Sequence, residues 1–225
     1  GQIRPYETFK TNITSTLNIL ELCRRFKVSR IVVASTVHVY GNSPLPYHED
    51  EPPRPSRPYE TSKTCTDLVA QSYADAFHLP VLIPRFVNIY GPGDLNFNRV
   101  IPKTIRSILQ GTNPTIWGGQ AQREYLYIDD AVVAYDLLVQ ISDAQIERNR
   151  IYNFGTGELI SVSALMRRII SLAGVNVTLH KIATGRPDEL PKQLVSWEKA
   201  KRVLGWKPKM QLENGLKQTI DWYRN

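Results

Sequence analysis

The chain has 225 residues and a formal net charge of +7, with 42% hydrophobic and 22% charged residues. This length can bury a full hydrophobic core, and the composition excludes disordered, collagenous and coiled-coil proteins. No apolar run approaches the roughly 20 residues that span a bilayer, and two cysteines, Cys23 and Cys65, are too few for a disulfide framework. We therefore expect a cytoplasmic enzyme or binding domain without a membrane segment.

The first part of the chain predicts alternating helices and strands. Apolar residues at helical spacing predict helices over 11–26 and 59–77, and apolar, β-branched runs predict buried strands over 30–35 and 79–86. The segment 41–58 is rich in Pro, Ser, Glu and Asp, which indicates a long loop. This order of elements is typical of an α/β protein with a parallel sheet.

The remainder of the chain predicts shorter elements, and the segment 88–98 is expected to be a loop. Short strands and helices are expected in the following order: strands over 114–117, 125–128, 151–154 and 177–182, and helices over 100–110, 129–141, 161–173, 197–204 and 212–223.

Tyr59 and Lys63 are four residues apart at the start of a predicted helix, so the phenol and the ammonium lie on one face. A nearby cation favours the phenolate, which makes Tyr59 a candidate general acid/base and Lys63 its electrostatic activator. An ordinary exposed pair is the alternative. Ser35 and Thr36 end a predicted strand, where ligands of parallel sheets bind. Thr36 can donate a hydrogen bond to a substrate oxygen, or both hydroxyls can satisfy backbone groups in a turn.

Seven motifs resemble the extended short-chain dehydrogenase/reductase family, and more narrowly its NAD-dependent nucleotide-sugar epimerases and dehydratases. They follow the family order over nearly the whole chain: Ser35-Thr36-x-x-Val39-Tyr40-Gly41, Pro58-Tyr59-x-x-Ser62-Lys63, Arg85-Phe-x-Asn88-x-Tyr90-Gly91-Pro92, Arg123-Glu-Tyr125-x-Tyr127-x-Asp129-Asp130-Ala131, Tyr152-Asn153-x-Gly155, Gly185-Arg186-Pro187-x-Glu189 and Leu204-Gly205-Trp206-x-Pro208. The resemblance implies an α/β fold with a partial Rossmann-type, doubly wound parallel sheet. Residues 1–90 would belong to the dinucleotide-binding domain, with 125–155 returning to it, and 91–225 would mainly form a smaller substrate-binding lobe.

The resemblance also implies a role for single residues around the cofactor NAD. Tyr59 would be the catalytic acid/base, Lys63 would position the nicotinamide ribose and lower the pKa of the phenol, and Thr36 would bridge the sugar hydroxyl to Tyr59. Ser35 and Asn12 complete the expected cofactor-binding set, in which Asn12 supports the active-site helix.

The substrate implied by the resemblance is a nucleotide-diphosphate sugar. Its binding residues would be an amide and three guanidinium groups, which suit diphosphate oxygens: Asn88, Arg99, Arg123 and Arg186. Surface charge is the alternative interpretation of each arginine. No metal site is expected.

Val37 and His38 stand where the family's 4,6-dehydratases typically have acidic or ionisable residues that serve water elimination. A valine cannot protonate a leaving hydroxyl, whereas His38 titrates near neutrality and can act, although a structural role is the alternative. The departure favours an epimerase, or a related oxidoreductase, acting at the sugar C4. A sugar-nucleotide 4,6-dehydratase is the alternative.

The chain contains no Gly-rich turn of the kind that brings a dinucleotide pyrophosphate to a helix N-terminus. Its first residues instead match the helix that follows the first three strands of the family. We therefore expect a truncated or split chain, or a degenerate family member. Because such a partial domain exposes a sheet edge and apolar helix faces, we expect a homodimer or a partner chain that completes the fold.

Three functions remain open from the sequence. The leading hypothesis is an enzyme of NAD-dependent chemistry on nucleotide sugars. The second is a non-catalytic protein that binds a nucleotide sugar in the same site, which the missing Gly-rich turn supports. The third is an RNA-binding protein of the same fold, which only the charge of +7 supports; the basic runs are short and scattered, so we expect no nucleic-acid partner.

Overall fold

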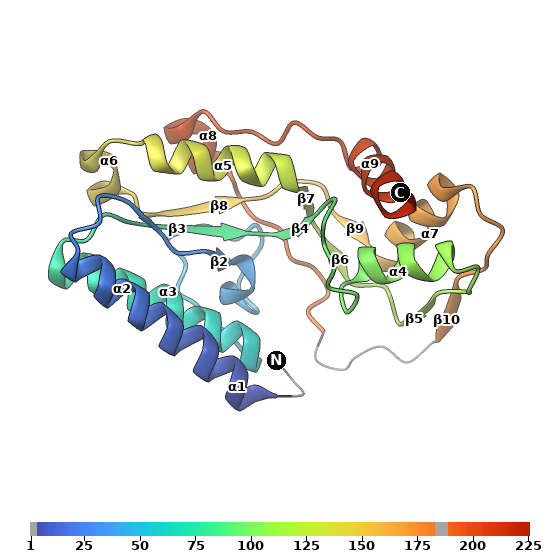
Figure 1. Ribbon diagram of the computed structural model, residues 1–225, viewed down its shortest axis with the longest axis horizontal. Coiled ribbons are helices and arrows are strands. Elements are labelled where there is room, and N and C mark those ends of the chain that lie inside the picture. Colours follow the sequence, from blue (N-terminus) through green and yellow to red (C-terminus); the bar gives the residue numbers. More distant parts are fainter. Residues whose placement is uncertain (1–3, 183–188) are drawn as a thin grey trace. The chain divides into compact units, whose positions relative to one another are not determined.

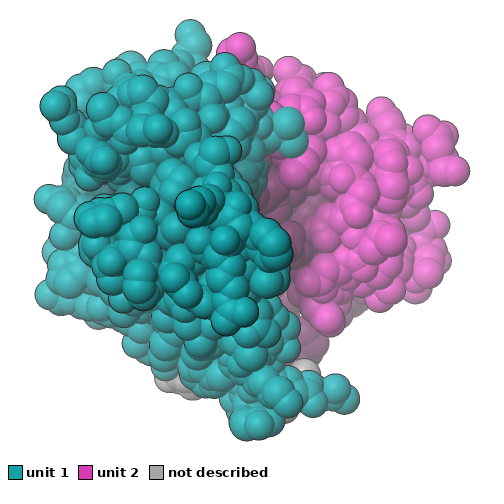
Figure 2. Space-filling view, turned by 60° about the vertical axis from the view of Figure 1, so that its left-hand side comes forward, with its two compact units in different colours: residues 1–87, 132–155, 195–207 teal, residues 88–131, 156–194, 208–225 magenta. Residues whose placement is uncertain are grey.

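A computed structural model describes residues 4–182 and 189–225, which form two compact units (Figures 1 and 2). Unit 1 comprises residues 1–87, 132–155 and 195–207, and unit 2 comprises residues 88–131, 156–194 and 208–225. No helix within the described residues is long and apolar enough to cross a membrane.

Unit 1 is built on a parallel sheet in which β3 (Val81–Phe86) lies between two neighbours. Along one side it pairs with β1 (Ile31–Val32) and then β2 (Ser35–Thr36), and along the other side with β8 (Ile151–Phe154). The strand predicted over 30–35 is thus two short pieces, although the Val33 N–H still donates to the Leu82 carbonyl at 2.8 Å. The α/β class with a parallel Rossmann-type sheet is confirmed.

Helices cover both faces of this sheet. Arg85 on β3 contacts α3 (Pro58–Phe77) through Asp67, whereas the next residue, Phe86, packs its ring against Tyr135 of α5 (Ile128–Gln140). Because successive side chains of a strand point to opposite faces, α3 and α5 lie on opposite faces. An apolar cluster between the sheet and the α3 side includes Leu20, Ala70 and Ile83.

The first helix predicted in the chain begins earlier than expected. α1 (Pro5–Phe9), a π-helical turn (Lys10–Thr14) and α2 (Ser15–Arg25) follow one another, and α2 lies beside α3 (Figure 1). The expected apolar face is only partly buried. Leu20 is buried, whereas Ile19, Leu22 and Phe26 are exposed, Phe26 by 77%. These three residues, which we call the α2 stripe, recur at i, i+3 and i+7 on one face.

Unit 2 packs helices over short strand pairs. α4 (Val100–Leu109), α7 (Val162–Ala173) and α9 (Leu212–Arg224) share an apolar core with β4 (Asn88–Tyr90) and β7 (Tyr125–Tyr127), which pair in parallel. The other strand pairs are parallel β5 (Thr115–Trp117) with β10 (His180–Ile182), and antiparallel β6 (Gln122–Arg123) with β9 (Ile160–Ser161).

Several further elements differ from the sequence predictions, including β6 and β9, for which no strand was expected. The expected loop over 88–98 begins with β4, which is too short for alternation to reveal it. A 3₁₀ turn, η2 (Val37–Tyr40), follows β2 directly. A short helix, α6 (Asp143–Arg148), was not predicted, although the capping box of Ser142 and Gln145 marks its start. The last helix of unit 1 is α8 (Glu198–Leu204).

Candidate active site

The start of α3 is fixed against the carboxyl end of the β1–β2 segment. Pro58 occupies the first turn, where its missing N–H costs no hydrogen bond. One turn on, the Lys63 ammonium donates to the Ala34 carbonyl at 2.6 Å. Tyr59, on the same helix face, is 45% exposed. The structure therefore places the predicted pair at the strand end, with the cation held by the backbone and Tyr59 nearly half exposed.

Burial lowers the pKa of Lys63 below its usual value, and the nearby Asp67 carboxylate partly opposes this shift. Among the described residues, the hydrogen-bond acceptor that Lys63 contacts is the Ala34 carbonyl. An ammonium has three N–H donors, so two remain for a ligand. Its desolvated charge is the kind that acts strongly on a nearby phenol.

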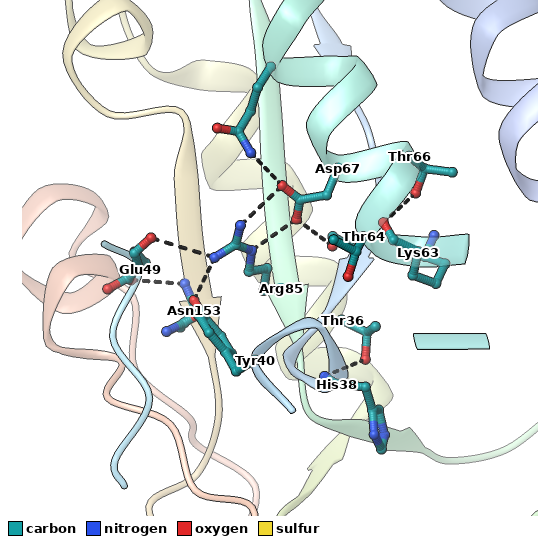
Figure 3. A network of polar contacts seen from close by, with 12 residues as sticks. Thr36, His38, Tyr40, Glu49, Lys63, Thr64, Thr66, Asp67, Arg85 and Asn153 are labelled. Carbon is teal, nitrogen blue, oxygen red and sulfur yellow. Dashed lines mark hydrogen bonds and ion pairs between the residues drawn. The ribbon is translucent and has the colours of Figure 1, made fainter. Parts of the chain in front are cut away.

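Thr36 and Ser35 are both buried, and their hydroxyls have different partners. The Thr36 Oγ1 accepts from the His38 N–H at 3.4 Å, a bond that caps η2 (Figure 3). The same hydroxyl donates to the Phe86 carbonyl oxygen at 3.5 Å. The Ser35 Oγ donates to Asp67 Oδ2 at 2.7 Å. Backbone capping, the alternative interpretation of the pair, is thus part of what Thr36 does, and Ser35 has its proton committed to a carboxylate.

Asn12 is hydrogen-bonded to the start of α3, as the resemblance implies. Its Nδ2 donates to the Ser62 Oγ at 2.8 Å, and that hydroxyl donates to the Tyr59 carbonyl at 2.8 Å. The π-helical turn that carries Asn12 is therefore tied to the first turn of α3, in which Tyr59 lies.

His38 lies against the candidate acid/base. The His38 and Tyr59 rings meet edge to face with centroids 6.3 Å apart, and His38 Nδ1 is 3.9 Å from Glu60 Oε1. Glu60 is buried and accepts from both the N–H and the hydroxyl of Ser56 at 3.2 Å. Sequence reasoning did not single out Glu60. Its place beside Tyr59 in the first turn of the predicted helix was the available signal.

A buried ion pair joins α3 to β3, and the sequence analysis did not predict it. Asp67 on α3 takes two hydrogen bonds from Arg85 on β3, Nε to Oδ2 at 2.9 Å and Nη2 to Oδ1 at 3.0 Å (Figure 3). Two signals pointed to it. Arg85 interrupts an apolar strand and so needs a partner when buried, and Asp67 follows Lys63 by one helical turn.

The loop after η2 depends on one glycine. Gly41 has φ +55°, and a Cβ at this position would lie 1.7 Å from the Arg54 carbonyl oxygen. Only a residue without a side chain fits this approach, so the chain turns away from the strand end at Gly41.

Three of the four predicted substrate residues are described in unit 2. Asn88 Nδ2 donates to the Glu124 carbonyl at 3.3 Å. Arg123 is mostly buried, donates to the Gln122 carbonyl at 2.8 Å, and lies 3.7 Å from the Glu189 carboxylate. Arg99 is exposed and pairs with Asp94 at 3.2 Å. Arg186 lies outside the described residues. The guanidinium groups of Arg99 and Arg123 thus have separate carboxylate partners.

The donor set of unit 1 fits one end of the expected cofactor. The ammonium of Lys63 and the phenol of Tyr59 are suited to ribose hydroxyls of a nicotinamide nucleotide. The sequence contains no G-x-G-x-x-G motif, so these residues account for the nicotinamide end alone. Within residues 4–182 and 189–225, no group of three or more His, Cys, Asp or Glu side chains is placed to hold a metal ion.

A parallel sheet with a Tyr–Lys pair at its strand ends agrees with the resemblance to the extended short-chain dehydrogenases/reductases. Residues 2–155 match the NAD dependent epimerase/dehydratase family, and the chain belongs to this family. It is 32% identical to dTDP-D-glucose 4,6-dehydratase of Mus musculus over 99% of the chain and 63% of the relative. It is 30% identical to UDP-glucuronate 4-epimerase of Thermodesulfobacterium geofontis over 97% of the chain and 66% of the relative.

Solved structures give the same family. UDP-glucose 4-epimerase of Thermotoga maritima with UDP-glucose superposes with a TM-score of 0.89 at 30% identity, over 98% of this chain and 71% of that one. dTDP-glucose 4,6-dehydratase of Bacillus anthracis with NAD superposes with a TM-score of 0.84 at 28% identity, over 96% and 68%. The chain spans 59% to 64% of the dTDP-D-glucose 4,6-dehydratases that it matches.

Proposed function

We propose that this chain carries the catalytic part of an NAD-dependent enzyme that acts at C4 of a nucleotide-diphosphate sugar. The observation that carries the proposal is the Lys63 ammonium fixed on the Ala34 carbonyl, with the exposed ring of Tyr59 on the same helix face. Family membership supports it, because the relatives named above are dehydratases and epimerases of such sugars.

Oxidation at C4 removes a hydride from carbon and a proton from the hydroxyl. A bound nicotinamide supplies the hydride acceptor. Tyr59 takes the hydroxyl proton, and the Lys63 cation stabilises the phenolate form that can do so. Thr36 holds the sugar hydroxyl for transfer, and Asn12 keeps the Tyr59 turn in place through Ser62. In an epimerase the same proton returns when hydride is delivered to the opposite face of C4.

Val37 favours epimerisation over dehydration, because a buried aliphatic side chain offers no proton to a leaving hydroxyl. A 4,6-dehydratase is the second candidate, and the position of His38 beside Tyr59 and Glu60 favours it. Dehydration requires removal of the proton at C5 and loss of the 6-hydroxyl as water, and an imidazole with a carboxylate neighbour can accept the C5 proton.

The experiment incubates the chain with NAD and UDP-glucose, UDP-glucuronate or dTDP-glucose in D₂O and follows the products by NMR. A C4 epimer without deuterium on carbon supports the epimerase. A 4-keto-6-deoxy sugar with deuterium at C5 supports the dehydratase. A sugar nucleotide that binds to the wild type without turnover, and binds equally to Tyr59→Phe, would support the non-catalytic alternative.

We also propose that the chain works as a homodimer or with a partner chain. The outer edge of β1 and β2 has no strand partner among the described residues, and the α2 stripe exposes apolar surface.

The free cysteines Cys23 and Cys65 support a cytoplasmic location, where thiols stay reduced.

A further inference from the structure

The buried pair of Asp67 and Arg85 is extensively hydrogen-bonded. Side-chain exposure is 0% for Asp67 and 2% for Arg85. Besides the two bonds from Arg85, the Asp67 carboxylate accepts from Ser35 Oγ at 2.7 Å and from Gln71 Nε2 at 2.7 Å. Both oxygens therefore have two donors each, which fixes the plane of the carboxylate.

The bonds continue through Arg85 into the rest of the strand end. Arg85 Nη1 donates to the Tyr40 hydroxyl at 2.9 Å, and this hydroxyl donates to Asn153 Oδ1 at 2.8 Å (Figure 3). The backbone N–H of Asn153 in turn donates to Glu49 Oε1 at 2.9 Å. The network thus joins β2, η2, α3, β3 and β8. Its member on α3, Asp67, follows Lys63 by one helical turn.

We propose that Asp67 and Arg85 are positioning residues of the candidate active site. Through Ser35 the pair fixes the strand end that carries Thr36, and through α3 it fixes the turn that carries Lys63. The negative charge of the Asp67 carboxylate also opposes the lowering of the Lys63 pKa by burial. The catalytic consequence rests on the proposed function, whereas the effect on Lys63 does not.

A purely stabilising pair would behave differently. Replacing a buried ion pair by apolar side chains is often neutral for stability, because the desolvation of two charges offsets their attraction. Such a replacement would leave the fold intact while removing the counter-charge of Lys63 and the acceptor of Ser35. The two roles can therefore be separated in one protein.

The test uses the 225-residue chain with its lysines reductively methylated with ¹³C-formaldehyde, and the Lys63 signal is assigned by its loss in Lys63→Arg. We expect Lys63 to titrate at lower pH in Asp67→Asn than in the wild type. Where Asp67→Asn does not fold, the double variant Asp67→Leu/Arg85→Met leaves no unpaired charge and should give a smaller downward shift, because the Arg85 cation is lost together with the carboxylate. Asp75→Asn, which removes an Asp–Arg pair from the far end of the same helix, should leave Lys63 unchanged.

Turnover provides the second readout. In the double variant we expect a loss of kcat of roughly tenfold or more, because misplacement of reacting groups is costly, with a smaller change in KM. Titration of Lys63 at the wild-type pH in a folded Asp67 variant, or an equal shift in Asp75→Asn, would overturn the proposal. A wild type without turnover, but with the expected Lys63 shift, would overturn the proposed function and leave the positioning role intact.

Discussion

The two ends of α3 present the same kinds of side chain in opposite environments. The first half carries Tyr59, Lys63 and the buried Asp67, which is held by four hydrogen bonds. The second half carries Asp75, whose side chain is 70% exposed and pairs with Arg150 at 2.5 Å. The comparison contrasts a desolvated Asp–Arg pair one helical turn after Lys63, for which we propose a positioning role, with an exposed pair for which we propose none.

The largest expected effect is on kcat and comes from Tyr59 in the first turn of α3. Tyr59→Phe should lower kcat by about 10²–10⁴-fold, because it removes the hydroxyl that transfers the proton. Tyr73→Phe, in the second half of the same helix, is the matched control and should leave kcat unchanged. Steady-state kinetics measures both variants, and comparable losses in the two would break the distinction between the ends of α3.

The two aspartates should differ in their effect on stability. Asp67→Asn leaves the Arg85 guanidinium buried without its counter-ion and should lower the free energy of unfolding by about 3–5 kcal/mol. Asp75→Asn should cost less than about 1 kcal/mol, because an exposed pair is screened by solvent. Urea denaturation followed by circular dichroism compares them. Equal costs would show that burial of the first pair has no energetic consequence.

The charged form of Lys63 should destabilise the folded protein at neutral pH. Since burial lowers its pKa in the folded protein, the unfolded chain binds more protons between that lowered value and the usual value of 10.5. The unfavourable contribution of Lys63 is therefore full below the folded pKa and fades as pH rises toward 10.5. Lys63→Met should therefore raise the free energy of unfolding at pH 7, and it should lower kcat because the activator of Tyr59 is lost.

Thermal unfolding of wild type and Lys63→Met at several pH values checks this sign. The advantage of the variant should shrink as the pH is raised. A stability difference that grows with pH, or a Lys63→Met variant less stable than the wild type at pH 7, would contradict this expectation. Either result would show that the fold stabilises the ammonium, and Lys63 would then be a weaker activator of Tyr59 than we infer.

The smallest effect on stability is expected on α2. Phe26→Ser in the α2 stripe should change the free energy of unfolding of the monomer by less than about 0.5 kcal/mol, because the side chain is exposed. It should nevertheless weaken self-association, which sedimentation velocity measures. A wild type that sediments as a monomer would contradict the homodimer, and an unchanged dimer in Phe26→Ser would exclude the stripe from its interface.

The elements with strong local signals were predictable. The helix expected over 59–77 is α3, which starts at Pro58 because its ring suits the first turn and ends before His78 in the left-handed conformation. The strand over 151–154 has the predicted bounds. The family resemblance, carried by motifs such as that of Tyr59 and Lys63, is also confirmed.

The parts that escaped prediction depend on contacts between distant residues. The bond from Ser35 to Asp67 and the bonds from Arg85 to Asp67 and Tyr40 join residues 18 to 45 positions apart, and no local pattern encodes such pairs. Glu60 is buried and accepts two hydrogen bonds from Ser56, a residue of the long loop that the sequence left without a defined path. The roles assigned to Asn88, Arg99 and Arg123 stay predictions.

The contact between Lys63 and the Ala34 carbonyl has an evolutionary consequence. A main-chain oxygen is present whatever amino acid occupies position 34, so substitutions there cannot delete the anchor of the ammonium. Insertions or deletions in the preceding strand can, because they move a different carbonyl into its place. Position 34 should therefore accept different amino acids, whereas the length of the strand before it should be constrained.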